Sequence, residues 1–338
     1  FHNVLCLSEA KGMDIIMKYL SEYKSGDRMY GIYLCKQVQD ATTKAGKPYK
    51  NVVLQDKTGT MDGKIWEPTD MAIADFEALD YIEVQGEVSS YQGSLQASIR
   101  RLRPAMKMEY DPADYLPVSG RNNDQMYSEL LQHIDGIKNP WLKKLLENFF
   151  IRDREFIKAF RQSSAAKSVH HGFVGGLMEH TLNVVNLCEY FSKTYPTLNR
   201  DLLMAAAICH DIGKTKELSA FPANDFTDAG QLLGHIVMGA EMIGEKVKGI
   251  PGFPPVLEAE LKHCILAHHG KFEFGSPKRP ALIEALALNL ADNADAQIEI
   301  FTEALKGAED CAWQGYNKLL ESNIRRTTGG QNYVEVSH

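Results

Sequence analysis

LLMAAAICHDIGK, residues 202–214, is the stretch that decides the fold of most of this 338-residue chain. Its apolar residues run without a polar break to adjacent His210 and Asp211, and Gly213 and Lys214 follow. A glycine just after an apolar stretch is a helix stop signal, so the sequence predicts a buried helix that ends in an imidazole and a carboxylate. An isolated His–Asp pair is more often a hydrogen-bonded core pair than a functional one, so its interpretation depends on the neighbouring segments.

Histidines gather around this pair. Eight of the 11 histidines lie between residues 170 and 269. Other apolar stretches carry a histidine or an acid near one end, at His180, His235, His268, His269 and Asp292. Helix bundles build metal sites from such groups on several helices. With the His–Asp pair these make five imidazoles and two carboxylates without a thiolate, which favours Mn, Fe, Co, Ni or Zn, and the count favours two ions bridged by a shared carboxylate.

The chain from residue 121 to 325 is predicted to be an all-α domain. Apolar residues recur there at three-and-four spacing, in the segments 123–137, 139–151, 154–166, 175–195, 200–213, 232–247, 255–270 and 280–306. His263 precedes His268 by about 140 degrees of helix and is expected to point elsewhere. His170 and His171 are expected to be exposed or to cap a helix.

Residues 26–105 predict a small β-barrel. Alternating apolar and aromatic residues mark five strands, at 29–38, 49–56, 59–66, 81–91 and 94–103. Between the third and fourth strands, Thr69 or Asp70 is expected to cap a short helix. Three strands, a helix and two strands is the succession of an OB-fold, which binds oligonucleotides or oligosaccharides. An SH3-like barrel or another small five-stranded domain is the alternative.

The predicted fold class is multidomain α+β, with an N-terminal five-stranded OB-fold barrel followed by an all-α helical bundle. The expected limits are an N-terminal extension with a lead-in helix over 1–25, the barrel over 26–105, a linker over 106–120, the helical domain over 121–325 and a flexible tail over 326–338.

Charge and cysteine usage set bounds on function. The net charge of −7 excludes a polycationic protein that coats nucleic acid or anionic membrane through bulk charge. None of the six cysteines forms a Cys-x-x-Cys pair, so we expect reduced thiols and a cytoplasmic location. No run approaches the roughly 20 apolar residues of a transmembrane helix, so no membrane partner is expected.

The order His180, His210-Asp211, His235, His268, Asp292 resembles the HD superfamily of metal-dependent phosphohydrolases, and HDIGK matches a common form of its central motif. With the barrel and the segments GGLMEHTL, LLGHI, HHG and GSPKRP, residues 14 to 325 are similar to the YhaM family of 3′-to-5′ exoribonucleases. The resemblance implies that His180, His210, Asp211 and Asp292 hold one metal ion. It also implies that Asp211 bridges to a second ion held by His235 and His268. His269 is either the ligand in place of His268 or a group that orients it.

The chemistry expected of an HD domain of this kind needs no side-chain nucleophile. Two divalent ions, with manganese as the first candidate, lower the pKa of a bridging water and stabilise the charge that develops in an in-line phosphoryl displacement. Asp211 and Lys214 are the expected catalytic residues. Lys214 is placed either to contact a phosphate oxygen or to act as a favourable cation at a helix C-terminus. Asn293 and Asp295 are interpreted as helix-capping or solvated residues.

Basic and aromatic residues indicate where a polyanion binds. Lys278 and Arg279 follow the metal histidines, and a solvated charged loop is the alternative interpretation. In the barrel, Trp66 and Arg101 are the preferred substrate-binding residues, since OB-folds stack bases on aromatic rings and contact phosphates with basic side chains. Aromatic residues in small barrels are, however, more often part of the core.

The predicted function is degradation of single-stranded RNA, with single-stranded DNA as a second substrate, to nucleoside 5′-monophosphates by metal-activated hydroxide. The family resemblance implies the 3′-to-5′ direction and the product. One alternative is an HD-type phosphodiesterase of cyclic dinucleotides or nucleotides. The cyclic-dinucleotide group usually carries Gly-Tyr-Pro after its metal histidines, whereas the only Gly-Tyr pair here, Gly315-Tyr316, precedes Asn317. The other alternative, a non-catalytic RNA-binding adaptor, predicts missing ligands, and none is missing. Homo-oligomerisation is left open.

Overall fold

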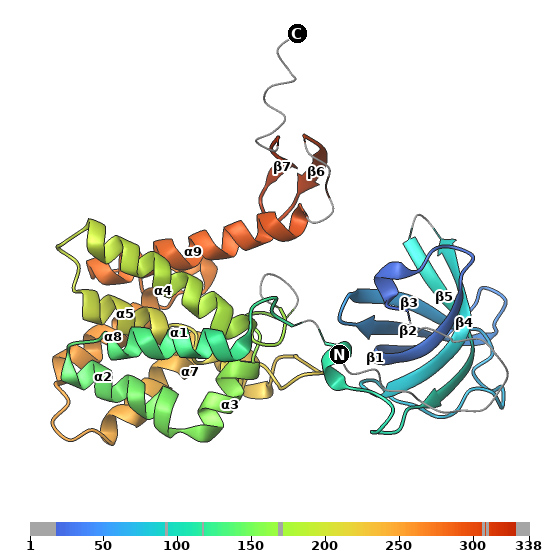
Figure 1. Cartoon of the computed structure of the whole chain (residues 1–338), viewed down its shortest axis with the longest axis horizontal. Coiled ribbons are helices and arrows are strands. Elements are labelled where there is room, and N and C mark those ends of the chain that lie inside the picture. Colours follow the sequence, from blue (N-terminus) through green and yellow to red (C-terminus); the bar gives the residue numbers. More distant parts are fainter. Residues whose placement is uncertain are drawn as a thin grey trace, which may run out of the picture. The chain divides into compact units, whose positions relative to one another are not determined.

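The computed structural model describes residues 18–91, 94–116, 118–167, 172–305, 308 and 311–328. The chain divides into two compact units, and the main division along the chain falls between Val118 and Ser119. A β-barrel forms the first unit and helices dominate the second (Figure 1). Residues 1–17, His170, His171 and the end of the predicted tail lie outside the described residues.

The first unit is a closed five-stranded barrel. Its strands are β1 (Arg28–Thr42), β2 (Pro48–Asp56), β3 (Gly59–Ile65), β4 (Tyr81–Tyr91) and β5 (Ser94–Pro104). Around the barrel they follow the order β1-β2-β3-β5-β4, and β3 pairs with β5 in parallel while the other neighbours are antiparallel. This five-stranded closed barrel confirms the predicted OB-fold.

Alternation of apolar and polar residues explains the barrel core. In β4, Ile82 and Val84 are fully buried, and burial of each such side chain contributes about 1.5–3 kcal/mol. Gly86 lies where the backbones of β4 and β5 approach each other closely. A Cβ at this position would lie 2.3 Å from the carbonyl oxygen of Ser98. A larger residue at Gly86 would therefore push the two strands apart.

The helix predicted between β3 and β4 is not present in residues 67–80, all of which the structure describes. This segment forms turns along β5: the N–H of Ala74 donates to the carbonyl of Leu102, whose N–H donates to the carbonyl of Ala72. The Asp70 carboxylate accepts from the N–H of Ala72 at 2.8 Å, as in a turn. The prediction was wrong because β5 offers this segment backbone hydrogen bonds that its local sequence does not reveal.

Segments on either side of the barrel pack against it. The short 3₁₀ helix η1 (Leu20–Glu22) is attached through the N–H of Leu20, which donates to Asp56 Oδ2 at 2.6 Å. After β5, Tyr115 is buried and its carbonyl accepts from Gln55 Nε2 at 3.1 Å. Part of the segment that was predicted as a linker therefore packs with the barrel.

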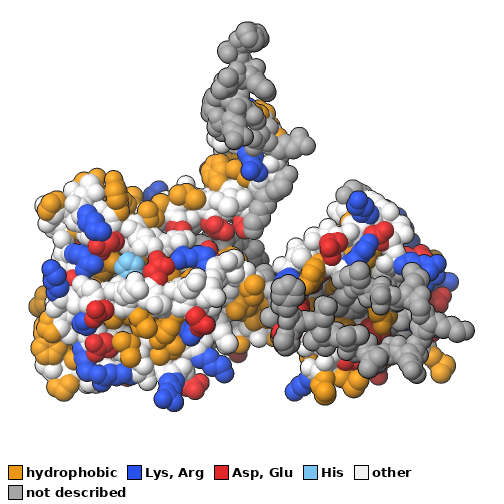
Figure 2. Space-filling model, in the orientation of Figure 1, with side chains coloured by type: hydrophobic (Ala, Val, Ile, Leu, Met, Phe, Trp, Pro, Cys, Tyr) orange, Lys and Arg blue, Asp and Glu red, His pale blue; other side chains and the backbone are white. Residues whose placement is uncertain are grey.

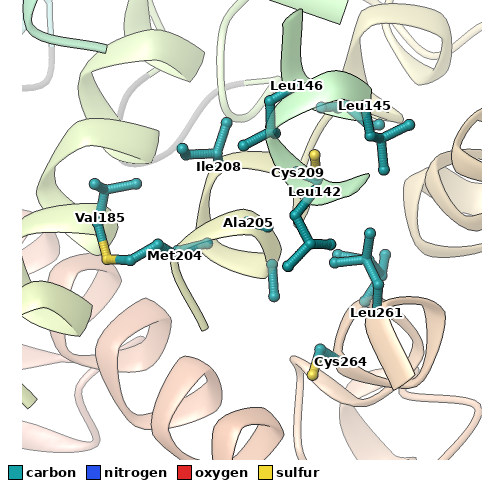
Figure 3. Packing of buried hydrophobic residues seen from close by; sticks show 14 of the residues in the cluster. Leu142, Leu145, Leu146, Val185, Met204, Ala205, Ile208, Cys209, Leu261 and Cys264 are labelled. Atoms are coloured by element: carbon teal, nitrogen blue, oxygen red, sulfur yellow. The ribbon is translucent and has the colours of Figure 1, made fainter. Parts of the chain in front are cut away.

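In its described residues, the second unit contains the eight predicted helices and one more α-helix, over Lys214–Glu217, that was not predicted. They are α1 (Asn123–Asp135), α2 (Pro140–Glu147), α3 (Arg154–Gln162), α4 (Gly176–Thr194), α5 (Arg200–Cys209), α6 (Lys214–Glu217), α7 (Asp228–Lys248), α8 (Pro255–Ala267) and α9 (Ile283–Ala304). In α5 every residue from Leu202 to Cys209 is buried. Leu142 of α2, Met204 of α5 and Leu261 of α8 belong to one core cluster (Figure 3). Truncating a leucine in such a core to alanine destabilises a protein by about 2–5 kcal/mol.

The end of the second unit differs from the all-helical prediction. After α9, β6 (Trp313–Asn317) and β7 (Ser322–Arg325) form an antiparallel hairpin (Figure 1). Of its residues, Ile324 is buried while Trp313 and Tyr316 are exposed. The hairpin was not predicted because WQGYN and SNIR do not alternate between apolar and polar residues.

Charged side chains of both signs are interspersed over the visible face of the helical domain (Figure 2). That distribution agrees with the exclusion of a polycationic coat. Among the described residues, no helix combines the length and the apolar character that crossing a membrane requires.

Candidate metal centre

His210 and Asp211 lie in the turn between α5 and α6, and both side chains are buried. Because α5 runs through the core, its end brings this pair to the interior of the bundle. Gly213 is required here: a Cβ at this position would lie 2.0 Å from the carbonyl oxygen of His235. The glycine of the HDIGK motif therefore permits the close approach of α7, which carries His235.

A kink in α7 positions His235. Gly234 has φ 73° and ψ 156°, a conformation that glycine adopts without steric strain. Immediately after it, the backbone N–H and the ring Nδ1 of His235 lie 2.9 and 3.0 Å from Glu217 Oε1. Glu217 therefore orients both the kink and the imidazole.

Three predicted ligands, His180, His210 and Asp292, form what we call the inner set. They come from α4, the turn after α5, and α9, and one ligand atom of each lies within 4.8 Å of the others. His180 Nε2 is 3.1 Å from both His210 Nε2 and Asp292 Oδ1. Ligands about 2.1 Å from a common ion stand roughly 3–4 Å apart, so this spacing fits one cation.

Three histidines, His235, His268 and His269, form the outer set. Their ligand atoms also lie within 4.8 Å of one another. His268 is the C-cap of α8 and is fully buried, whereas His269 is half-buried. The sequence left open which of the two adjacent histidines is a ligand. The structure places both rings in the outer set.

Asp211 lies between the two sets. Its Oδ2 is 3.5 Å from His180 Nε2 and 3.4 Å from His210 Nε2. Its Oδ1 is 3.4 Å from His235 Nε2 and 3.7 Å from His268 Nε2. One oxygen of a single carboxylate thus faces each set, which is the arrangement of a bridging ligand.

All five imidazoles have a hydrogen-bond acceptor at Nδ1. Three of them donate to main-chain carbonyls: His210 to Ala207, His268 to Ile265 and His269 to Phe274, at 2.8, 2.7 and 2.8 Å. A carbonyl only accepts, so Nδ1 carries the proton and Nε2 presents its lone pair to the centre. Metal-binding histidines are oriented in this way.

Two carboxylates hold the other two imidazoles. Asp295 Oδ2 lies 2.7 Å from His180 Nδ1, and Glu217 Oε1 lies 3.0 Å from His235 Nδ1. The interpretation of Asp295 as a capping or solvated residue was wrong, because one helical turn beyond Asp292 it lies on the same buried face of α9. Glu217 was not predicted either; its only signal in the sequence is an acid close after the His–Asp pair.

Asn293 lies between Asp292 and Asp295 in the sequence, but on a different face of α9. It is exposed and accepts from Gln297 Nε2 at 2.9 Å. The interpretation of Asn293 as a solvated residue is confirmed.

Burial and charge compete at the centre. Burial lowers the pKa of His180, but its contacts with Asp292 and Asp295 outweigh burial and raise the pKa to about 9. Burial raises the pKa of Asp211, but the Lys214 ammonium and the neighbouring histidines hold it well below its ordinary value. Burial also lowers the pKa of His268 well below that of a free imidazole. The anionic carboxylate of Asp211 thus faces the neutral imidazole of His268.

Several buried acceptors in the centre face one another without a hydrogen-bond donor. Among the described residues, Asp211 Oδ1, His235 Nε2 and His268 Nε2 are buried and have no hydrogen-bond partner. Such groups are costly to bury unless a cation satisfies them. The donor set, imidazole and carboxylate without thiolate, fits divalent transition metals.

Lys214 belongs to the same centre. Its Nζ lies 2.6 Å from Asp211 Oδ2, and its side chain is largely buried. Burial lowers the pKa of this lysine, but Asp211 outweighs burial and raises it. A fixed ammonium therefore lies beside the carboxylate that faces both sets.

Other predicted residues lie outside this centre. Lys278 and Arg279 are exposed on the loop after the outer set, and the Arg279 guanidinium lies 5.1 Å from the centre of the Phe272 ring. His263 Nε2 accepts from the N–H of Ala281 at 2.8 Å, so this histidine points elsewhere, as expected. The substrate-binding roles of Lys278 and Arg279 stay predictions.

The barrel residues predicted to bind substrate are exposed. Trp66 is 49% exposed and stacks on Tyr49 with 5.2 Å between ring centroids. On β5, Arg100 and Arg103 pair with glutamates. Arg101 between them has no ion pair within the described part of the chain. These two side chains are accessible, and their roles stay predictions.

Comparison with known proteins places this geometry in a family. The HD domain family matches residues 177–297, which include every residue of the two sets. The 3′-5′ exoribonuclease YhaM of Halalkalibacterium halodurans is 34% identical over 287 residues, covering 84% of this chain and 88% of the relative. The chain belongs to the YhaM family. The YhaM exoribonuclease of Listeria innocua serovar 6a is 32% identical over 292 residues, covering 86% of this chain and 91% of that protein.

Two solved structures resemble part of this YhaM-family chain. The second OB-fold domain of replication protein A from Methanococcus maripaludis is 21% identical, with a TM-score of 0.23, and covers 27% of this chain and 95% of that domain. A replication protein A heterotrimer bound to single-stranded DNA is 18% identical, with a TM-score of 0.20, and covers 26% of this chain and 65% of the matched chain.

Proposed function

We propose that this YhaM-family chain is a metal-dependent 3′-5′ exoribonuclease that removes nucleotides from single-stranded RNA at the centre around Asp211. The expected products are nucleoside 5′-monophosphates, and single-stranded DNA is expected to be a second substrate. Membership of the family supports the direction of cleavage. The buried histidines and carboxylates support the dependence on metal.

The observation that carries the proposal is the placement of the Asp211 carboxylate. Its two oxygens face two separate sets of ligands, at 3.4–3.7 Å. The inner set, His180, His210 and Asp292, would hold one divalent ion, and the outer set, His235, His268 and His269, a second. When bound, two such ions supply a water of lowered pKa and stabilise the negative charge of an in-line phosphoryl displacement. Manganese is our first candidate.

The side chains of the chain itself prepare the centre. Asp295 and Glu217 fix two imidazoles, and three main-chain carbonyls fix the others, so that every Nε2 points inward. Lys214 keeps a cation beside Asp211, where it would contact an oxygen of the reacting phosphate. Because the water that bound ions would activate is the nucleophile, no side-chain nucleophile is needed.

The barrel is proposed to capture the RNA strand. The exposed stack of Trp66 on Tyr49 offers a flat apolar face to a base, and Lys64 Nζ lies 5.7 Å from the Tyr49 ring centre. Arg101 adds a guanidinium without an ion pair in the described chain. Stacking with nearby positive charge is how OB-folds hold single strands with little sequence preference.

End-labelled RNA tests the proposal. Protein stripped of metal with a chelator and reloaded with Mn²⁺ should shorten 5′-labelled RNA to a ladder, and should release labelled mononucleotide from 3′-labelled RNA at the earliest times. Protein without added metal is the control. A ladder that shortens from the 5′ end, or no cleavage with Mn²⁺, would refute the proposal.

A further inference from the structure

The loop that follows the outer set exposes two aromatic rings. Residues Phe272–Phe274 form the 3₁₀ helix η4, and the side chains of Phe272 and Phe274 are 58% and 62% exposed. Both are large apolar groups, whereas Phe149, Phe150 and Phe160 of the same unit are buried in its core. Neither ring belongs to a described core cluster.

Hydrogen bonds hold this loop in place, so the rings are presented by an ordered backbone. Gly270 has φ 75°, and a Cβ there would lie 2.6 Å from the side chain of Asn289, whose Nδ2 donates to the carbonyl of His268. Further along, the buried hydroxyl of Ser276 lies 3.0 Å from the carbonyl oxygen of Leu266. The loop is therefore attached to both α8 and α9.

The same loop is attached to the metal centre. His269 Nδ1 donates to the carbonyl of Phe274 at 2.8 Å, while its Nε2 belongs to the outer set. Only one imidazole ring separates the backbone of Phe274 from the position that an ion would occupy. A nucleotide whose phosphate reached the outer set would thus have its base, or the base of its neighbour, within reach of the rings.

Cationic side chains accompany both rings. The Arg279 guanidinium lies 5.1 Å from the centre of Phe272, and Lys271 Nζ lies 5.4 Å from the centre of Phe274. Neither cation has an ion pair among the described residues. Aromatic faces with positive charge beside them are the two elements of single-strand recognition, one for the base and one for the phosphate.

We propose that Phe272 and Phe274 form a base-stacking site that positions the nucleotides next to the bond being cleaved. Its ligand is the nucleobase of any single-stranded nucleic acid, since every base has a face that stacks. This inference rests on the proposed exonuclease function and adds to it a site that is separate from the barrel. A merely structural role, or a role in docking a protein, would not depend on the bases of the substrate.

Substitution of the rings combined with base-free RNA tests the site. The variant F272A/F274A keeps the Phe274 carbonyl that orients His269, so its metal content should equal that of the wild type. On an oligoribonucleotide its kcat/KM should fall about 5- to 150-fold, the range that one stacked base contributes. F272Y/F274Y, which keeps the rings, should restore activity. Y190A, which removes a 64% exposed aromatic from α4, is the matched control.

The same comparison is made on an oligoribonucleotide whose last two nucleotides carry no base. The wild type should lose activity on this substrate, and F272A/F274A should lose nothing more. If the double variant lost the same factor with and without bases, or lost nothing on normal RNA that the wild type degrades, the stacking site would be refuted while the nuclease function stood. If the wild type failed to degrade RNA at all, the proposed function would fail as well.

Discussion

The metal centre and the barrel surface use polar and aromatic side chains in opposite ways. At the centre, five imidazoles are held at Nδ1, and the carboxylate of Asp211 is buried among them. On the barrel, Trp66 and Arg101 are exposed. Trp66 stacks on Tyr49, and Arg101 has no ion pair among the described residues. Bond cleavage needs fixed groups, because an error of about 1 Å lowers the rate about 10²-fold. Capture of a strand tolerates mobile side chains. Changes at the centre should therefore alter turnover, and changes on the barrel should alter affinity.

Asp211→Asn should have the largest effect. The substitution removes the charge that faces both sets, so the loss of turnover should exceed the roughly 10- to 100-fold typical of a group that only orients a ligand. Single-turnover degradation of labelled RNA measures the rate, and fluorescence anisotropy should show that RNA binding survives. Asp228→Asn, an exposed acid at the start of α7, is the control. Near-normal turnover in Asp211→Asn would contradict the assignment.

Lys214→Met should have the second-largest effect on turnover. If the ammonium stabilises charge on the reacting phosphate, kcat should fall about 10²- to 10³-fold with little change in RNA affinity. Lys216→Met, which removes an exposed lysine two residues away, should leave kcat unchanged. A loss of affinity with normal turnover of bound RNA would instead place Lys214 with the strand-capturing residues.

The substitutions Asp295→Asn and Glu217→Gln test the inner set and the outer set separately. Each substitution removes the charge that holds one imidazole, so each should weaken one ion about 10- to 100-fold and leave the other in place. Metal titration followed by elemental analysis after dialysis measures both ions, and each variant is the control for the other. Two ions retained at wild-type affinity in both variants would show that these carboxylates do not orient ligands.

Arg101→Gln should have the smallest effect. Loss of one phosphate contact should lower the slope of log affinity against log salt by about 0.7, with unchanged turnover at saturating RNA. Arg100→Gln is the matched control, because Arg100 is already paired with Glu87 at 3.1 Å. An equal change in both variants would remove the special role of Arg101.

Periodicity predicted the long helices and strands and failed at two segments. Nineteen residues of α4 or eleven of β4 are enough for a period of three-and-four or of two to appear. Residues 67–80 carried helix signals and nevertheless paired with β5, and the short strands β6 and β7 carry no alternation of apolar and polar residues. Hydrogen bonds to β5 decided the first segment, and pairing between β6 and β7 decided the second.

By itself, the sequence determined the candidate ligands, imidazoles and carboxylates without a thiolate, and their order along the chain, since these follow from composition and local pattern. Only the tertiary structure decided how these groups are arranged: Asp211 faces both sets, and His268 and His269 belong to the same set. Asp295 and Glu217 orient the rings of His180 and His235. The reason is physical. Periodicity reports which face of a helix is buried, but the packing of α4, α7, α8 and α9 around the end of α5 decides which buried faces meet.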